Sequence, residues 1–248
     1  MRQSELPSDR KPASAGRCFG VAQRRKEALS KMNSVRSRAI EAHKEVLKLD
    51  KIQREVIVGV LLGDGCLESQ NSGRTYRLKI EQPARHREYV DHLYGLFEDW
   101  VRTPPRDDEV RASNGSVMTN VVFATLSHPA LRFFAHSFNA GGTKSVPKLI
   151  HRMLSPRAIA YWFMDDRSMK SSQSKSIVLN TQCSELPDVE RLAAALSSYE
   201  LEVKPRKQHD GWQLYVSGRS YERFVALVDP FVIESMRYKI PKNRNIIA

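Results

Sequence analysis

The sequence twice passes through an apolar segment into acidic residues, first at Ile57-Val58-Gly59-Val60-Leu61-Leu62-Gly63-Asp64-Gly65 and again at Ile159-Ala160-Tyr161-Trp162-Phe163-Met164-Asp165-Asp166-Arg167. An apolar helix that stops at a carboxylate places that acid at the negative end of the helix dipole. Two such helices packed together would hold two acids side by side, where they repel each other unless a cation lies between them. The two segments therefore predict a metal site shared by two half-domains.

The charge balance of the chain suits a polyanionic partner. The 248 residues include 40 Lys and Arg against 28 Asp and Glu, which gives a formal net charge of +12. Hydrophobic residues make up 41% and charged residues 27%, as in an ordinary soluble globular protein. Nucleic acid is the commonest polyanion that such an excess of positive charge binds. A basic solvated surface without a specific partner is the alternative.

Cysteine content and apolar run length restrict the class of protein. The three cysteines, Cys18, Cys66 and Cys183, are far apart and form no Cys-x-x-Cys pair. This pattern fits a reducing compartment and argues against a disulfide framework or a structural zinc site. No apolar run approaches the roughly 20 residues that span a bilayer, so we expect a soluble protein without a membrane partner.

The beginning of the chain differs from the rest. The first stretch, to about residue 20, lacks hydrophobic periodicity and is expected to be disordered. From Arg24 to Leu49 the pattern is helical with a strongly basic face, which fits either a solvated helix or an arm that contacts phosphates. We therefore divide the chain into a basic N-terminal extension with a helix, residues 1–48, a first repeat, residues 49–150, and a second repeat, residues 151–248.

The two repeats follow one plan. After each acid come a polar stretch, a strand, a helix, a hairpin, a second helix and a basic phrase. The matching segments are the polar stretches 68–74 and 168–174, the strands 76–82 and 177–182, the helices 86–101 and 186–199, the turns Asn114-Gly115 and Asp210-Gly211, the helices from Pro129 and Ser220, and the phrases Lys144-Ser145-Val146-Pro147-Lys148 and Lys239-Ile240-Pro241-Lys242. The offsets of the acids, strand-end glutamines, turns and lysines are 102, 100, 96 and 95. Such a slow drift indicates a duplicated domain with small deletions.

The strands offer side chains that contact DNA. In the first repeat, alternation places Tyr76, Leu78 and Ile80 on one face and Arg77, Lys79 and Glu81 on the other. A sheet with long basic side chains on its outer face fits a DNA major groove, where Arg, Lys and Gln bind base edges. The hairpins add further candidates, each of which has a solvated surface role as its alternative: Arg111, Asn120, Lys204, Arg206, Lys207, Gln208 and Gln213.

With these motifs the chain resembles a LAGLIDADG homing endonuclease of the single-chain, two-repeat type carried by group I introns. The resemblance covers about Val56 to Pro241 and rests on the two apolar motifs together with four further phrases. These are Thr125-Leu126-Ser127-His128, Ser155-Pro156-Arg157, Val178-Leu179-Asn180-Thr181-Gln182 and Met236-Arg237-Tyr238-Lys239-Ile240-Pro241. The family implies an α+β fold in which two pseudo-symmetric αββαββα repeats form a DNA-binding saddle, with the motif helices crossing at the pseudo-dyad. Gly59 and Gly63 would permit the close backbone approach there.

The resemblance also implies the roles of individual residues. Asp64 and Asp166 match the metal-binding acids, with Asp165 either orienting Asp166 or contributing its carbonyl. Lys144 and Lys239 match the basic residues beside the two scissile phosphates. The polar positions that order solvent around the metal match Gln82 and Gln182, and His86 matches a basic position of some relatives. Hard oxygen ligands favour Mg²⁺, for which Mn²⁺ would substitute.

The second motif departs from the family pattern at Arg167, which replaces the glycine expected after the second acid. A guanidinium there would pair with Asp166, compete with the metal or contact the DNA backbone. A glycine also reaches backbone conformations that arginine adopts only with strain. We therefore expect weakened cleavage of one strand.

Two functions follow from the resemblance. The first is a monomeric, sequence-specific DNA endonuclease that starts intron homing by Mg²⁺-dependent double-strand cleavage, leaving 3′ overhangs at one long, asymmetric site. The second is a maturase that binds intron RNA and assists splicing without needing the acids. A transcription regulator on the same scaffold would usually bring a helix-turn-helix domain. Introns of this type imply a mitochondrial or chloroplast location.

Overall fold

The computed structural model describes residues 37–111, 115, 117–140, 143–168, 175–181, 185–209 and 211–240, without the side chains of 140 and 166–168. The chain separates into two units, residues 1–47 and residues 48–248. In the first unit, residues 37–46 form a helix, which confirms the C-terminal part of the helix expected from Arg24. The rest of that expected helix and the segment expected to be disordered lie outside the described residues.

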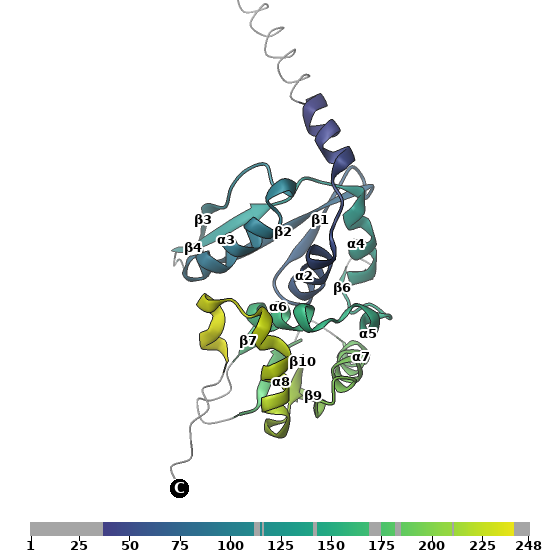
Figure 1. Cartoon of the computed structure of the whole chain (residues 1–248), viewed down its shortest axis with the longest axis vertical. Coiled ribbons are helices and arrows are strands. Elements are labelled where there is room, and N and C mark those ends of the chain that lie inside the picture. The colour runs from purple at the N-terminus through teal and green to yellow at the C-terminus, as the bar shows by residue number, and fades with distance from the viewer. Residues whose placement is uncertain are drawn as a thin grey trace, which may run out of the picture. The chain divides into compact units, whose positions relative to one another are not determined.

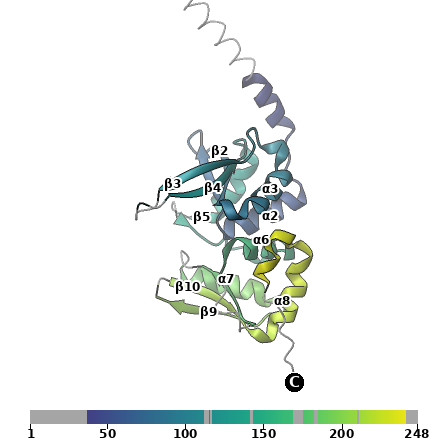
Figure 2. The same ribbon diagram turned by 90° about the vertical axis from the view of Figure 1, so that its left-hand side faces the viewer.

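The second unit contains two four-stranded antiparallel sheets whose strands follow the same order, β1-β2-β4-β3 and β7-β8-β10-β9 (Figures 1 and 2). The strands of the first sheet are β1 (Cys66–Gln70), β2 (Thr75–Pro83), β3 (Arg106–Arg111) and β4 (Val117–Ala124). Those of the second are β7 (Arg167–Ser168), β8 (Ile177–Asn180), β9 (Val203–Gln208) and β10 (Gly211–Val216), and β5 (Asn139–Ala140) pairs with β6 (Thr143–Lys144). The predicted α+β fold is therefore confirmed.

Helices cover the apolar faces of both sheets. The α-helices are α2 (Lys51–Leu62), α3 (Arg87–Leu96), α4 (Arg132–Phe138), α5 (Ile150–Met153), α6 (Pro156–Asp166), α7 (Leu186–Ser197) and α8 (Tyr221–Val228). Short 3-10 helices are η1 (Ala84–His86), η2 (Glu98–Trp100), η3 (Pro129–Leu131), η4 (Gly218–Ser220), η5 (Asp229–Phe231) and η6 (Glu234–Lys239). Within the described part of the chain, no helix has the length and apolar content of a membrane span.

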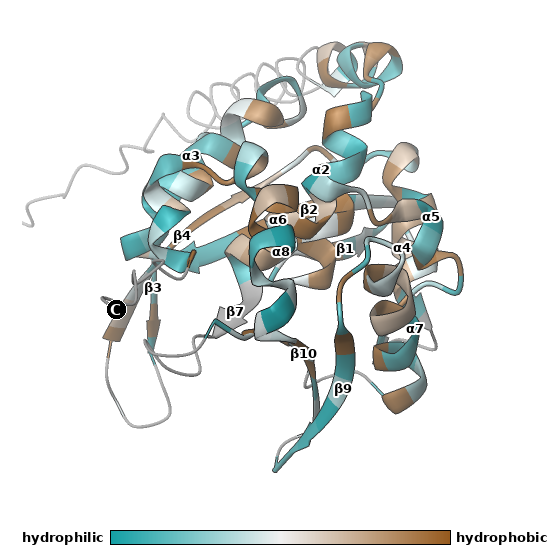
Figure 3. Ribbon diagram, turned by 60° about the horizontal axis from the view of Figure 1, so that its bottom comes forward, coloured by the Kyte–Doolittle hydropathy of each residue, from teal (hydrophilic) through white to brown (hydrophobic). Residues whose placement is uncertain are grey.

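The two motif helices, α2 and α6, pack against each other at the centre of the second unit (Figure 1). Asp50 begins α2 with a capping box, in which its side chain accepts a hydrogen bond from the Gln53 backbone at 2.7 Å. The residues that follow are buried from Val56 to Leu62, and α6 is buried from Ala158 to Met164. Figure 3 shows the hydrophobic character of α6. This apolar contact joins the two sheets and their helices.

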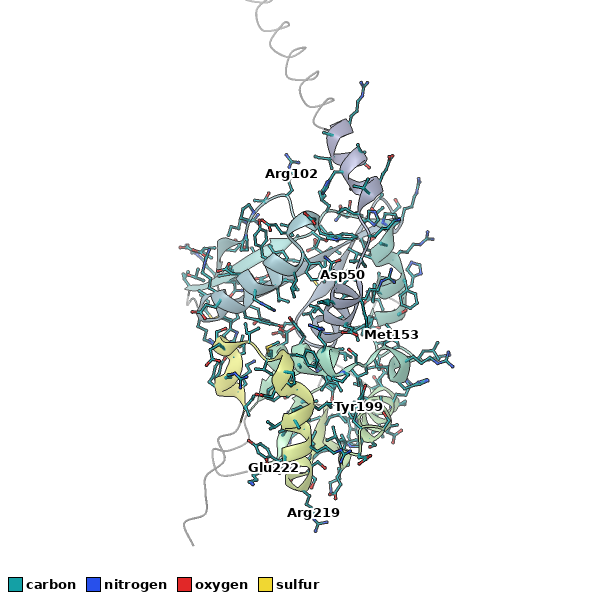
Figure 4. The ribbon with its side chains drawn as sticks, in the orientation of Figure 1. Asp50, Arg102, Met153, Tyr199, Arg219 and Glu222 are labelled. Carbon is teal, nitrogen blue, oxygen red and sulfur yellow. The ribbon has the colours of Figure 1, made fainter. Side chains whose placement is uncertain are left out.

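Close approach of the motif helices depends on glycine. A Cβ atom at Gly59 would lie 2.5 Å from the Ala158 carbonyl oxygen and 2.7 Å from the Tyr161 Cβ, closer than real Cβ atoms come. The expected role of Gly59 at the helix crossing is therefore confirmed. Just before α6, the Leu154 carbonyl accepts a hydrogen bond at 2.6 Å from the hydroxyl of Tyr199, a residue labelled in Figure 4 that follows α7.

The structure corrects two element predictions. The polar stretch 68–74 is partly strand, because β1 continues to Gln70 and the turn occupies only the next four residues. The helix expected over 86–101 ends at Leu96, where the Phe97 N–H bonds both the Leu93 and the Tyr94 carbonyl and tightens the chain into η2. The strands beside both predicted hairpin turns are present, but Asn114 and Asp210 lie outside the described residues.

Candidate active site

The C-terminal ends of α2 and α6 bring two carboxylates together. The backbone N–H of Asp64 donates a hydrogen bond to Asp165 Oδ2 at 3.3 Å. Gly63 makes this approach possible, because a Cβ at that position would lie 2.7 Å from the same oxygen. One acid from each repeat therefore lies at the junction of the two motif helices.

Gln82 bridges the two acids from the end of β2. Its side chain is buried, and its Nε2 donates to Asp64 Oδ2 at 2.9 Å and, in a longer contact, to Asp165 Oδ1 at 3.4 Å. These groups line a cavity of about 400 Å³. The residues around it are Asp64, Gln82, Pro83, Arg85, His86, Asp165, Tyr238 and Lys239.

The site disfavours two negative charges. Burial, with the neighbouring charge of Asp64 as a further cause, raises the pKa of Asp165 from 3.8 to about 8. The buried Tyr89 hydroxyl makes no well-formed hydrogen bond. Burial raises the pKa of Tyr89, and the nearby Asp165 carboxylate raises it further. A cation between the carboxylates would relieve this repulsion.

The donor set fits a divalent cation of the Mg²⁺ type. Asp64 and Asp165 supply hard carboxylate oxygens, and Mg²⁺ is commonly held by one or two carboxylates together with water and substrate phosphates. Among the described residues, no group of three or more His, Cys, Asp or Glu side chains forms a complete metal site. The two acids fit a cation whose remaining ligands come from water and a phosphate-bearing substrate.

The two lysines occupy matching positions in the two repeats. Lys144 Nζ donates to the carbonyl of Gly63, the residue before Asp64. Lys239 Nζ donates to the carbonyl of Met164, the residue before Asp165, and lies 3.2 Å from the Asp165 carbonyl oxygen. Lys239 thus contacts both the residue before Asp165 and the residue before Asp166, so its contacts are compatible with either acid as the counterpart of Asp64. The side chain of Asp166 lies outside what the structure describes.

The starts of the following strands favour Asp165 as the counterpart of Asp64. Strand β1 begins at Cys66, two residues after Asp64, and β7 begins at Arg167, two residues after Asp165. The helix crossing gives a different spacing, because Gly59 meets Tyr161 and Gly63 meets Asp165, each pair 102 residues apart, as are Asp64 and Asp166. The interpretation of Arg167 as the residue in the glycine position stays a prediction. Arg167 is an extended strand residue paired with Leu179, in a conformation that any residue adopts without strain.

Of the other predicted site residues, the structure places His86 at the cavity. His86 lies in it, with Nδ1 3.2 Å from Gln82 Oε1, whereas Gln182 lies outside the described residues. The sequence interpretation missed Tyr89 and Tyr238, which approach Asp165 and His86. For Tyr238 the only signal was its place within the last quoted phrase, since 152 residues separate it from its partner.

The first sheet presents a mixed surface. Strand register places Arg77, Lys79 and Arg106 on the face opposite the buried Leu78 and Ile80. Both basic residues of β2 are in ion pairs, Arg77 with Glu68 at 2.5 Å and Lys79 with Glu81 at 2.7 Å. Asn120 also lies on this face and donates to Glu81 at 2.9 Å.

The candidate Arg111 lies on the opposite face. It pairs with Val117 five residues beyond Arg106, and an odd step along a strand reverses the side-chain direction. Three acidic residues precede it in β3 as Asp107, Asp108 and Glu109. Of these, Asp107 pairs with Arg87 of α3 at 2.6 Å, on the helix side of the sheet. The grouping of Arg111 with Arg77 and Lys79 is therefore not supported by the register.

The second sheet divides its candidates in the same way. Register with β10 places Lys204, Arg206 and Gln208 on the face of Gln213, whereas Lys207 pairs with Trp212 on the side of the buried Leu214. Gln213 donates to Asn180 at 3.0 Å across the sheet. The Arg206 guanidinium lies 6.0 Å from the ring centre of Tyr215 on this face.

Comparison with known proteins gives consistent results. The family model described as "LAGLIDADG DNA endonuclease family" matches residues 54–224. The probable intron-encoded endonuclease 1 of Wickerhamomyces canadensis is 29% identical over 203 residues, which cover 79% of this chain and 87% of that protein. The cytochrome b mRNA maturase bI2 of Debaryomyces hansenii is 29% identical over 198 residues, which cover 77% of this chain and 74% of the maturase.

A solved structure shares the whole architecture of the second unit. The homing endonuclease I-WcaI bound to its DNA recognition sequence superposes with a TM-score of 0.78 at 27% identity, covering 83% of this chain and 93% of that chain. Its agreement in fold joins a family match that spans both motif helices and both sheets. The chain belongs to the LAGLIDADG DNA endonuclease family, whose members are phosphodiester hydrolases.

Proposed function

We propose that this chain is a sequence-specific double-strand DNA endonuclease of intron homing, which acts as a monomer at one long, asymmetric site. The observation that supports it most is the pairing of Asp64 and Asp165 at the helix crossing, with one lysine from each repeat beside them. A single chain supplies both acids and both lysines. It therefore needs no second copy to cut both strands.

The proposed chemistry is Mg²⁺-dependent hydrolysis that leaves 3′ overhangs, with Mn²⁺ as a substitute. Bound between the acids, the cation would supply an activated water and neutralise charge on the phosphate. Asp64 and Asp165 would hold it, and Gln82 would fix the orientation of their carboxylates. Lys144 and Lys239 would stabilise the negative charge that develops on the scissile phosphates.

Our assignment of the second acid differs from the one that the sequence motif favours. We propose Asp165 in place of Asp166, because the Asp165 carboxylate lies against the Asp64 backbone and Gln82, and β7 begins two residues after it. The expected weakening of cleavage on one strand by Arg167 stays a prediction.

DNA contacts are proposed for the outer faces of the two sheets. Arg77, Lys79, Lys204 and Arg206 lie on these faces. The ion pairs of Arg77 and Lys79 would have to exchange an acid for a phosphate or base edge on binding. Sequence is chosen by base contacts, whereas phosphate contacts set affinity and its salt dependence.

A maturase function is the second candidate, supported by the likeness to the protein named as a cytochrome b mRNA maturase. It would use intron RNA as its partner and would not need the paired acids. Either function suits a group I intron in an organelle genome, and we propose a mitochondrial or chloroplast location on that basis alone.

Cleavage of the joined exons tests the proposed function. A plasmid would carry the exon junction from an allele without the intron in which this reading frame lies. We expect purified protein with Mg²⁺ to linearise it and to leave 3′ overhangs, as mapped by primer extension. Binding of the junction without cutting of either strand in Mg²⁺ or Mn²⁺ would refute the proposal and favour the maturase.

A further inference from the structure

Three polar groups form a line from the protein surface to the paired acids. Tyr238 Oη lies 3.1 Å from His86 Nε2, and His86 Nδ1 lies 3.2 Å from Gln82 Oε1. The Gln82 amide then donates to Asp64 and, at longer range, to Asp165. Since Tyr238 belongs to η6 of the second repeat and His86 to η1 of the first, the line crosses between repeats.

The acid end fixes the direction of these hydrogen bonds. An ionised carboxylate only accepts, so Gln82 must turn its NH₂ group toward Asp64 and its oxygen toward His86. That oxygen requires a donor, which places the His86 proton on Nδ1. The remaining nitrogen, Nε2, is then an acceptor.

The groups around Nε2 agree with this assignment. Both of its neighbours are able to donate, the Tyr238 hydroxyl at 3.1 Å and Arg85 Nε at 3.3 Å. A neutral imidazole is also favoured, because burial, Lys239 and Arg85 lower the pKa of His86 more than Asp64 raises it. One arrangement of protons, with neutral His86 in the Nδ1–H tautomer, satisfies every contact in the line.

We propose that His86 and Tyr238 are positioning residues, which hold the Gln82 amide in the orientation that presents its NH₂ group to the two acids. With the amide turned over, its oxygen would face the Asp64 carboxylate, an unfavourable contact between two acceptors in a buried site. The inference rests on the proposed endonuclease function. It adds a tyrosine from the second repeat to the groups that set the geometry of the site.

Three substitutions separate positioning from folding. Tyr238→Phe removes only the hydroxyl of a side chain that is 57% exposed. His86→Ala removes both ring nitrogens, and His86→Asn restores an N–H close to the place of Nδ1. His92→Ala is the matched control, because His92 Nε2 also bonds a tyrosine of the second repeat, Tyr161 at 2.7 Å, but contacts neither Gln82 nor Asp64.

The first readout is the cleavage rate of the exon-junction DNA in Mg²⁺, measured with protein in excess, alongside DNA affinity without divalent cations. We expect His86→Ala to slow cleavage about 10–100-fold, as loss of an outer partner of a metal site does. Tyr238→Phe should slow it about fivefold, the equivalent of one hydrogen bond. His86→Asn should recover part of the rate, His92→Ala should match wild type, and affinity should not change.

The second readout is the tautomer of His86, from the ¹⁵N chemical shifts of its ring in protein without DNA and metal. We expect the proton on Nδ1. An Nε2–H tautomer, or a wild-type cleavage rate in His86→Ala, overturns the proposal. If wild type cuts neither strand, the endonuclease function fails, and the tautomer still decides whether the line of hydrogen bonds exists.

Discussion

Asp165 accepts a hydrogen bond from the backbone of Asp64, although 101 residues separate them in the chain. The contact exists because α2 and α6 cross at glycine, end at the same level and direct an acid from each repeat into one cavity. Burial, with the neighbouring charge of Asp64 as a further cause, raises the pKa of Asp165 to about 8. The predictions below follow from this pair and from the faces on which the basic residues lie.

Stability should depend sharply on the absence of a side chain at Gly59. Gly59→Ala would force a methyl group against Ala158 and Tyr161, and we expect it to cost about 1–3 kcal/mol in the free energy of unfolding. Gly95→Ala, within α3, meets no atom within 4 Å and should instead gain about 0.5–1 kcal/mol. Urea denaturation of both variants checks the pair, and equal effects would contradict the close helix crossing.

The stability of metal-free protein should fall as pH rises from about 4 to about 8, because Asp165 releases its proton in the unfolded chain while the folded protein retains it. The sign follows from the raised pKa, because between the ordinary and raised values the folded state binds more protons than the unfolded state. Thermal unfolding in EDTA across this range should show the slope in wild type. Asp165→Asn should lose that part of it, and a difference between the two proteins that does not vary with pH would contradict the shift.

Neighbouring basic residues of β9 should differ in their effect on DNA binding. Arg206 lies on the proposed DNA face and Lys207 on the opposite one, and both side chains are exposed. We expect Arg206→Ala to weaken binding and to reduce the slope of log affinity against log salt by about 1 if it contacts a phosphate. Lys207→Ala should change neither quantity. Fluorescence anisotropy over a salt series compares the two variants. A stronger effect of Lys207→Ala than of Arg206→Ala would show that the two faces are assigned incorrectly.

The repeated plan was predictable because each repeat has its own strands, helices, hairpin turn and basic closing phrase, although only the first repeat alternates apolar and polar residues along its strand. The alternation in 76–82 predicted the buried Leu78 and Ile80, which the structure confirms. The faces of Arg111 and Lys207 were not predictable, because they depend on strand register, and a shift of one residue reverses every side chain.

The sequence also did not reveal which acid of the second motif lies against Asp64. Asp165 and Asp166 are adjacent at the end of one helix, and only packing against α2 decides which of them faces Asp64. Tyr238 belongs to the site through a contact between distant segments, which no local pattern records. Length and motif thus predicted where the site lies, and tertiary contacts decided which side chains complete it.

Parallel cleavage assays of Asp165→Asn and Asp166→Asn, with Asp64→Asn as the reference, test the central pairing most directly. Each variant would be incubated with the exon-junction plasmid and Mg²⁺, and nicked and linear products would be quantified against wild type. We predict that Asp64→Asn and Asp165→Asn abolish double-strand cleavage while still binding the DNA, and that Asp166→Asn still cuts both strands. Loss of cleavage in Asp166→Asn with activity retained in Asp165→Asn would contradict the account.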